Sequence, residues 1–249
     1  MIMMYLVLIY GLLLGSFYNV VGIRVPQKKS IVAPRSACPH CGHELKAWEL
    51  IPVVSYFLVR GKCSSCRTPI SPIYPIMEAL TGFLFAFAYW KVGLSAELLV
   101  ALLLISLLVI ISISDLHFML IPDRILLWFA SFFLVTHIWF SWIPWLDSFI
   151  GAAVGFILLL LIAIISKGGM GGGDIKLYAV IGFVLGWKLT LLSFMLASAF
   201  GAVVGVILMT FRKASRKQAV PFGPFISLGV LVAYFNGEDL IFWYVTYFM

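Results

Sequence analysis

The chain has 249 residues, of which 63% are hydrophobic and only 11% are charged. Soluble domains are roughly 45–50% apolar and about 25% charged, and a soluble fold of this length has too little interior for so much apolar side chain. Intrinsic disorder is excluded as well, because it requires low hydrophobicity. The composition therefore predicts a polytopic membrane protein that has the lipid bilayer as a partner.

Apolar stretches recur along the chain and predict its helices. They lie at 1–21, 73–93, 96–114, 121–143, 147–166, 176–187, 189–211 and 222–247. The first stretch lacks a small-residue cleavage site, which favours a retained helix over a secretory signal. We therefore predict an all-α fold with about eight transmembrane helices. The expected parts are a first helix at 1–23, a polar domain at 24–72 and a core of about seven helices at 73–249.

The net charge of +7 is explained by membrane topology. If the polar domain faces the cytoplasm and the chain crosses at each apolar stretch, only Lys91 and Lys188 of the 17 Lys and Arg residues lie outside. The inner set then includes a cluster formed by Arg212, Lys213, Arg216 and Lys217. Such a surplus is what the positive-inside rule predicts. We therefore expect both termini outside and no nucleic-acid partner.

All four cysteines lie in the polar domain, as CPHC, a gap of 21 residues, and CSSC. Two CxxC pairs at this separation are typical of four thiolates that close a tetrahedron on Zn²⁺, and His40 or His43 could replace one of them. The reducing cytoplasm disfavours two disulfides. Four thiolates leave no open position, which predicts a structural zinc. The expected ligands are Cys38, Cys41, Cys63 and Cys66.

Two further features of the sequence leave alternatives open. Glu78 lies one turn inside the second span, where an acid is a functional candidate by default, although a structural partner would explain it equally well. Polar and aromatic residues near the cysteines form either a small-molecule site or simply the surface of a small fold. These residues are Glu49, Ser55, Tyr56, Arg60 and Gly61.

Three aspartates lie at the cytoplasmic side of the predicted core. Asp123 follows Pro122 at a helix start, where proline and an anion are both favoured. Asp174 follows the run KGGMGGG and could be a helix N-cap. Asp115 has no such explanation, because it ends an apolar helix, where the dipole disfavours a carboxylate.

The glycine run lacks the spacing of a phosphate-binding loop. Its glycines instead allow a close approach that would carry Asp174 toward Asp115, 59 residues away in sequence. Two carboxylates at one site do not both ionise easily, so one keeps a proton and the other is a base. Such a pair can activate water for peptide hydrolysis. A Ser-His-Asp arrangement is less favoured, because no serine lies in an elbow motif.

Several motifs, in order over most of the chain, resemble those of the type IV prepilin peptidases, and of their competence branch most closely. They are GSFYNVVGIRVP at 15–26, the two CxxC pairs, YPIMEALTG at 74–82, DLHFMLIPD at 115–123 and GMGGGDIKL at 169–177. The resemblance implies an aspartic endopeptidase of the bacterial inner membrane that removes the basic leader of prepilins or pseudopilins at the cytoplasmic face. It also implies N-methylation of the new N-terminus with S-adenosylmethionine, at a site that no sharp motif locates.

By motif, the resemblance assigns catalysis to Asp115 and Asp174. The supporting candidates are Asp123, Gly171, Gly173 and Lys176. The four cysteines match those of zinc-carrying members, while some relatives lack them. Two rival hypotheses remain: a proton- or cation-coupled transporter that uses the intramembrane acids, and a zinc-stabilised scaffold without catalysis.

Overall fold

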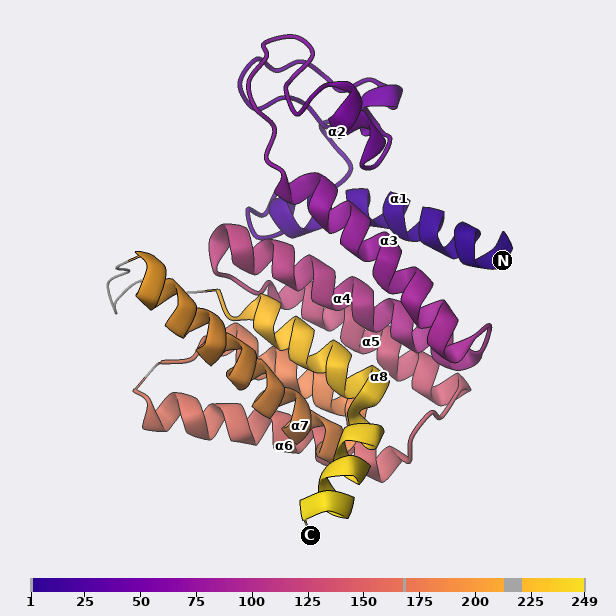
Figure 1. Cartoon of the computed structure of the whole chain (residues 1–249), viewed down its shortest axis with the longest axis vertical. Helices are drawn as coiled ribbons and strands as arrows, with labels where there is room; N and C mark the ends of the chain where they lie inside the picture. The colour runs from indigo at the N-terminus through magenta and orange to yellow at the C-terminus, as the bar shows by residue number, and fades with distance from the viewer. Residues whose placement is uncertain (1, 168, 213–220, 249) are drawn as a thin grey trace. The chain divides into compact units, whose positions relative to one another are not determined.

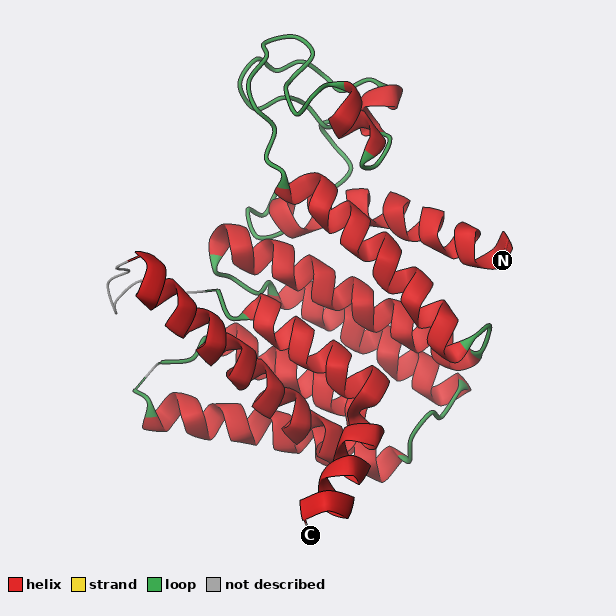
Figure 2. Cartoon of the chain, viewed as in Figure 1, coloured by secondary structure: helices red, strands yellow, loops and turns green. Residues whose placement is uncertain are grey.

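The structure is a computed structural model, and it describes residues 2–167, 169–212 and 221–248. Helix dominates this part of the chain, which contains no strand apart from two isolated bridges (Figure 2). The basic residues Lys213, Arg216 and Lys217 lie outside the described residues. The chain divides into two units, residues 1–114 and residues 115–249, and each is described by itself.

Unit 1 contains α1 (Ile2–Arg24), α3 (Ile73–Val92) and most of α4 (Ala96–Phe118). Helices α1 and α3 lie side by side, because glycines let their backbones approach closely (Figure 1). A Cβ atom at Gly15 of α1 would lie 2.9 Å from the Cα atom of Glu78 in α3. The Tyr18 hydroxyl shares a 2.6 Å hydrogen bond with Ser106 Oγ, which joins α1 to α4.

Between α1 and α3 lies a small domain that contains the 3-10 helix η1 (Ala47–Leu50) and α2 (Val54–Leu58). Its cysteine pairs occupy two turns of the same design. In the first turn, the Cys38 N–H donates to the His43 carbonyl, and an isolated bridge joins Ala37 to Glu44. The second turn repeats this 25 residues later, with Cys63 N–H donating to Thr68 and a bridge from Lys62 to Pro69. The CxxC repeat in the sequence is therefore also a structural repeat.

Unit 2 contains the end of α4 and four helices: α5 (Asp123–Trp139), α6 (Trp145–Ile165), α7 (Gly172–Arg212) and α8 (Gly223–Phe248). Pro122 and Pro144 precede α5 and α6, as is common at helix starts. Helix α7 contacts α5, α6 and α8. The contact with α6 depends on Gly151 and Gly182, where a Cβ atom on either residue would overlap the backbone of the other helix.

Helix α7 is interrupted at Gly186, whose φ of +73° and ψ of 171° are not helical. Tyr178 and Phe194 lie eight residues to either side of this glycine, and their rings make an edge contact at 5.9 Å. In a straight helix, residues 16 positions apart would be separated by about 24 Å. The chain therefore reverses direction at Gly186, and α7 is a pair of antiparallel helices.

The predicted fold class is confirmed. Six of the described helices are long and apolar enough to cross a membrane, with α7 counted once and the 17-residue α5 not included. The reversal at Gly186 divides α7 into two helices, which correspond to the separate apolar stretches expected at 176–187 and 189–211. The eight predicted stretches correspond to α1, α3, α4, α5, α6, the two halves of α7, and α8.

Candidate active site and cysteine cluster

Asp115 is buried at the end of α4, where only 6% of the residue is exposed. Its Oδ2 atom accepts a 2.6 Å hydrogen bond from the backbone N–H of Gly223, the first residue of α8. The unsatisfied N–H groups and positive dipole end of a helix make its start a natural site for a carboxylate. In the sequence, Asp115 does not lie at the start of a helix. Tertiary packing brings the start of the distant helix α8 to its carboxylate.

Asp174 is half-buried in the first turn of α7. Its Oδ2 atom accepts a 3.2 Å hydrogen bond from the Gly171 N–H, three residues earlier. This contact satisfies one of the free N–H groups at the helix start, as an acidic side chain does in a capping box. The expected N-terminal location of Asp174 is therefore present, although its carboxylate caps the helix from the third position rather than from the N-cap.

A third aspartate lies beside the start of α7. Lys176 Nζ contacts Asp123 Oδ2 at 2.7 Å, which links the first turns of α5 and α7. Both side chains are more than half exposed. Near them, Gly173 lies against Ile121, and a Cβ atom on Gly173 would be 2.7 Å from the Ile121 Cβ. A glycine at this position is therefore what allows α7 to approach the segment before α5 so closely.

Asp115, in the last turn of α4, lies near enough for its charge to act on Asp174 in the first turn of α7, although 59 residues separate the two in sequence. Each carboxylate accepts a hydrogen bond from a backbone N–H at a helix start. For Asp115 this is the start of α8, and for Asp174 it is the start of α7. Two interacting carboxyls of this kind can share acid and base roles. The arrangement is suited to hydrolysis by activated water.

The four cysteines form the one cluster of potential metal ligands among the described residues, and their sulfur atoms all lie within 4.8 Å of one another. The Cys38–Cys66 and Cys41–Cys63 sulfur pairs are separated by 3.7 and 3.9 Å. A tetrahedral zinc ion with Zn–S bonds of about 2.3 Å requires sulfurs about 3.8 Å apart. The four thiols therefore fit this ion.

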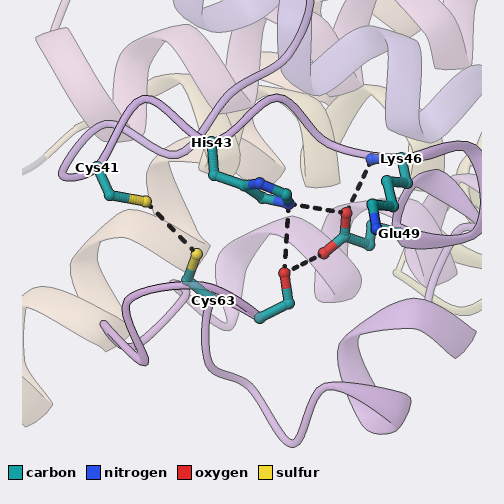
Figure 3. Close-up of polar contacts among 6 residues, drawn as sticks. Cys41, His43, Lys46, Glu49 and Cys63 are labelled. Carbon is teal, nitrogen blue, oxygen red and sulfur yellow. Dashed lines mark hydrogen bonds and ion pairs between the residues drawn. The ribbon is translucent and has the colours of Figure 1, made fainter.

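His43 is not part of the sulfur cluster, and it lies in a polar network around Glu49 (Figure 3). The Glu49 carboxylate accepts hydrogen bonds from the Ser64 hydroxyl at 2.5 Å and the Lys46 N–H at 2.8 Å, and it lies 3.2 Å from His43 Nε2. These partners, Ser64 above all, hold the pKa of Glu49 below its ordinary value. The network joins the two cysteine turns, because His43 follows Cys41 and Ser64 follows Cys63.

Gly223 is a site residue that sequence reasoning missed. It lies within PFGPF at 221–225, and the glycine and prolines there are ordinary signals of a helix start. That signal places the beginning of α8, but it carries no information about a contact with Asp115, which is 108 residues earlier. The packing of α8 on the rest of unit 2 decides this contact.

Comparison with known proteins identifies the family of this chain. Residues 9–92 match the Bacterial Peptidase A24 N-terminal domain, and residues 102–206 match the Type IV leader peptidase family. A prepilin leader peptidase/N-methyltransferase of Bacillus subtilis (strain 168) is 44% identical over 98% of both chains. The chain belongs to the type IV leader peptidase family. Both matched regions lie where this family assignment was expected from the sequence motifs.

Other relatives in the type IV leader peptidase family carry the same name. The protein of Pseudomonas putida is 35% identical, over 93% of this chain and 90% of its own length. That of Legionella pneumophila is 34% identical over 99% and 96% of the two chains. No solved structure matches the chain significantly. Family membership favours the peptidase hypothesis over the transporter.

Proposed function

We propose that this chain is a membrane aspartic endopeptidase that removes the short basic leader of prepilins or pseudopilins. The observation that carries the proposal is that unit 2 brings buried Asp115 near enough to half-buried Asp174 for its charge to act there, with a backbone N–H partner for each carboxylate. The relatives named prepilin leader peptidase/N-methyltransferase support the substrate class.

In this mechanism, the carboxylate of one of the two aspartates removes a proton from a water molecule while the water oxygen attacks the scissile carbonyl carbon. The other aspartate, protonated, donates its proton to the amide nitrogen as the carbon–nitrogen bond breaks. Asp123 and Lys176, paired at 2.7 Å, are positioning residues that hold the starts of α5 and α7 together. Gly171 and Gly173 serve the same helix start, Gly171 as a donor to Asp174 and Gly173 by its contact with Ile121.

The four cysteines of the small domain are proposed to hold one structural Zn²⁺ through Cys38, Cys41, Cys63 and Cys66. Their sulfur separations support this assignment. A small domain with two short helices has little apolar core, so the metal would supply much of its folding free energy. Proteolysis needs no step at this metal, because a site closed by four thiolates has no open position.

We also propose the membrane orientation and the second activity. The excess of Lys and Arg at one side of the predicted spans supports an orientation with residues 24–72 and both catalytic aspartates on the cytoplasmic side. The bacterial relatives support the inner membrane as the location. The name of the relatives supports N-methylation of the cleaved pilin with S-adenosylmethionine as methyl donor.

The test of the peptidase is leader cleavage by the full chain in detergent or lipid, measured by the mass change of a prepilin. Asp115→Asn and Asp174→Asn should each abolish cleavage and leave the thermal unfolding of the protein close to that of the unchanged chain. Asp239→Asn is the matched control, because this exposed acid lies 16 residues beyond Gly223, about 24 Å along α8. Cleavage by both aspartate variants would overturn the proposal.

A further inference from the structure

Unit 1 contains a cavity of about 530 Å³ that the peptidase mechanism does not use. Its walls come from the ends of α1 and α3 and from the cysteine domain. This volume is in the range of cavities that bind small molecules, which are mostly apolar and contain a few convergent polar groups. The polar side chains that α1 and α3 contribute to the lining include Ser16, Asn19, Tyr74 and Glu78.

Asn19, which lines this cavity, carries a buried polar atom without a partner. Only 3% of the residue is exposed, and its Nδ2 group donates to the Tyr74 carbonyl at 3.2 Å. The Asn19 Oδ1 atom is buried and has no hydrogen-bond partner among the described residues. Leaving such an acceptor unsatisfied is energetically unfavourable. A buried, unsatisfied acceptor that lines a cavity points to a ligand that donates a hydrogen bond.

Glu78 places a carboxylate in the lining of the same cavity. The close approach at Gly15 brings α1 against Glu78, and the Ser16 hydroxyl hydrogen-bonds the Glu78 carboxylate. The Val53 N–H donates to Glu78 Oε2 at 2.7 Å, which ties the cysteine domain to α3. An acid inside a span is expensive to keep, and is a functional candidate for that reason.

The backbone at Val53 is strained in a way that serves this contact. Val53 has a φ of +62°, a conformation that is a genuine outlier for a β-branched residue. Backbone strain of this kind is concentrated at functional sites. Here the strained residue is the one whose N–H is directed at Glu78.

The acceptors that α1 and α3 contribute to the lining of the cavity match a primary ammonium group in number and charge. Asn19 Oδ1, Ser16 Oγ and the Glu78 carboxylate present three hydrogen-bond acceptors and one negative charge, and an ammonium has three donors and one positive charge. The cavity also has cationic residues, Arg24 and Lys62, in its lining. Two of the Arg24 donors already bind the Ser30 and Pro34 carbonyls, at 3.1 and 2.8 Å.

We propose that this cavity binds an α-ammonium group, which Glu78, Asn19 and Ser16 hold. The inference rests on the proposed methyltransferase activity for its choice of ligand, because that reaction has two molecules with an α-ammonium. One is the new N-terminus of the cleaved pilin, and the other is the amino-acid end of S-adenosylmethionine. Ammonium recognition by the same three residues would serve either molecule.

The experiment is equilibrium binding to the full-length protein in detergent, so its readout needs no catalysis. The first arm uses a peptide with the mature pilin N-terminus, free or N-acetylated. The second arm uses S-adenosylhomocysteine, which keeps the α-amine, and methylthioadenosine, which lacks the amino-acid end. Each ligand is titrated against the unchanged chain, Glu78→Gln, Asn19→Leu and the control Glu97→Gln. Glu97 is an exposed acid in the first turn of α4.

In one of the two arms, Glu78→Gln should raise the Kd of the free-amine ligand by about tenfold or more, since hydrogen bonds to charged groups contribute about 1.5–3 kcal/mol. Glutamine keeps an acceptor for the Val53 N–H, so the fold should tolerate this change. Asn19→Leu should weaken the same ligand, and Glu97→Gln should not. The ligand that lacks the free amine should bind the unchanged chain and Glu78→Gln equally.

The arm that responds identifies the source of the ammonium. The proposal is overturned if the unchanged chain binds neither free-amine ligand, or if neither Glu78→Gln nor Asn19→Leu changes either Kd by more than about twofold. Leader cleavage by the unchanged chain is measured on the same preparation. Cleavage without ammonium binding would contradict this inference alone, and binding without cleavage would contradict the proposed peptidase alone.

Discussion

The backbone N–H of Gly223 donates a 2.6 Å hydrogen bond to the buried carboxylate of Asp115, 108 residues earlier in the chain. The contact places the start of α8 directly against the end of α4 within unit 2. A Cβ atom at Gly223 would lie 2.9 Å from both Cβ and Oδ2 of Asp115, so the site has no room for a larger residue. Gly223 thereby positions the proposed catalytic acid.

Gly223→Ala should therefore lower leader cleavage. The added methyl group displaces the Asp115 carboxylate, and a misplacement of about 1 Å can cost about 100-fold in rate. The measurement is the initial rate of prepilin cleavage, together with its pH profile, which a merely structural change would not move. Gly205→Ala is the control, because a Cβ atom there meets nothing within 4 Å. Equal rates for the two variants would show that the Gly223 contact does not position Asp115.

Two adjacent glycines of the GGGD segment should respond differently to alanine. A Cβ atom on Gly173 would lie 2.7 Å from Ile121 Cβ, whereas one on Gly172 would meet nothing within 4 Å. Gly173→Ala should move the start of α7 and reduce cleavage by about tenfold or more, with a lower melting temperature. Gly172→Ala should leave the cleavage rate and the melting temperature close to those of the unchanged chain. The contact is unimportant if the two variants are indistinguishable in rate and melting.

Removal of the metal should unfold the cysteine domain. We expect about one zinc per chain by elemental analysis, and a loss of that zinc in Cys63→Ser, whose thiol is buried. Chelation should make residues 25–72 readily cleaved by an added protease. Ser65→Ala lies between the cysteines of the same turn and is the control, since its side chain is exposed. Protease resistance that persists after complete zinc removal would contradict a structural role.

The network around Glu49 predicts a pH dependence of stability. Because Ser64 and its other partners hold the pKa of Glu49 below its unfolded value, the carboxylate stabilises the folded domain at neutral pH. This contribution is present above the unfolded pKa of about 4.3 and is lost as the pH falls through the folded pKa. Between pH 7 and pH 4, the unchanged chain should lose more protease resistance in residues 25–72 than Glu49→Gln does.

Acid also protonates the zinc thiolates, and it does so in both chains, so only their difference reports on Glu49. Ser64→Ala removes the hydrogen bond that lowers the Glu49 pKa most. This variant should show a pH dependence between those of the unchanged chain and Glu49→Gln. An identical pH dependence in the unchanged chain and Glu49→Gln would show that the network adds no stability.

Much of the architecture was predictable because it depends on local properties of the chain. Hydropathy predicts membrane helices wherever about 20 apolar residues recur. The CxxC spacing predicts the sulfur cluster, since each pair needs only one short turn to converge. The aspartates that precede or begin helices, Asp123 and Asp174, were likewise placed by adjacent proline and glycine residues.

The remaining features depend on contacts between distant segments. The apolar residues on both sides of Gly186 are compatible with one long helix or with a reversal, and only the Tyr178–Phe194 contact decides. The partner of Asp115 is a backbone N–H, which every non-proline residue carries, so no pattern could single out Gly223. The approach of α1 to Glu78 in α3 depends on how closely the two helices pack at Gly15. Sequence by itself therefore determined the membrane class, the helices and the residues capable of chemistry, while tertiary packing decided which of those residues meet.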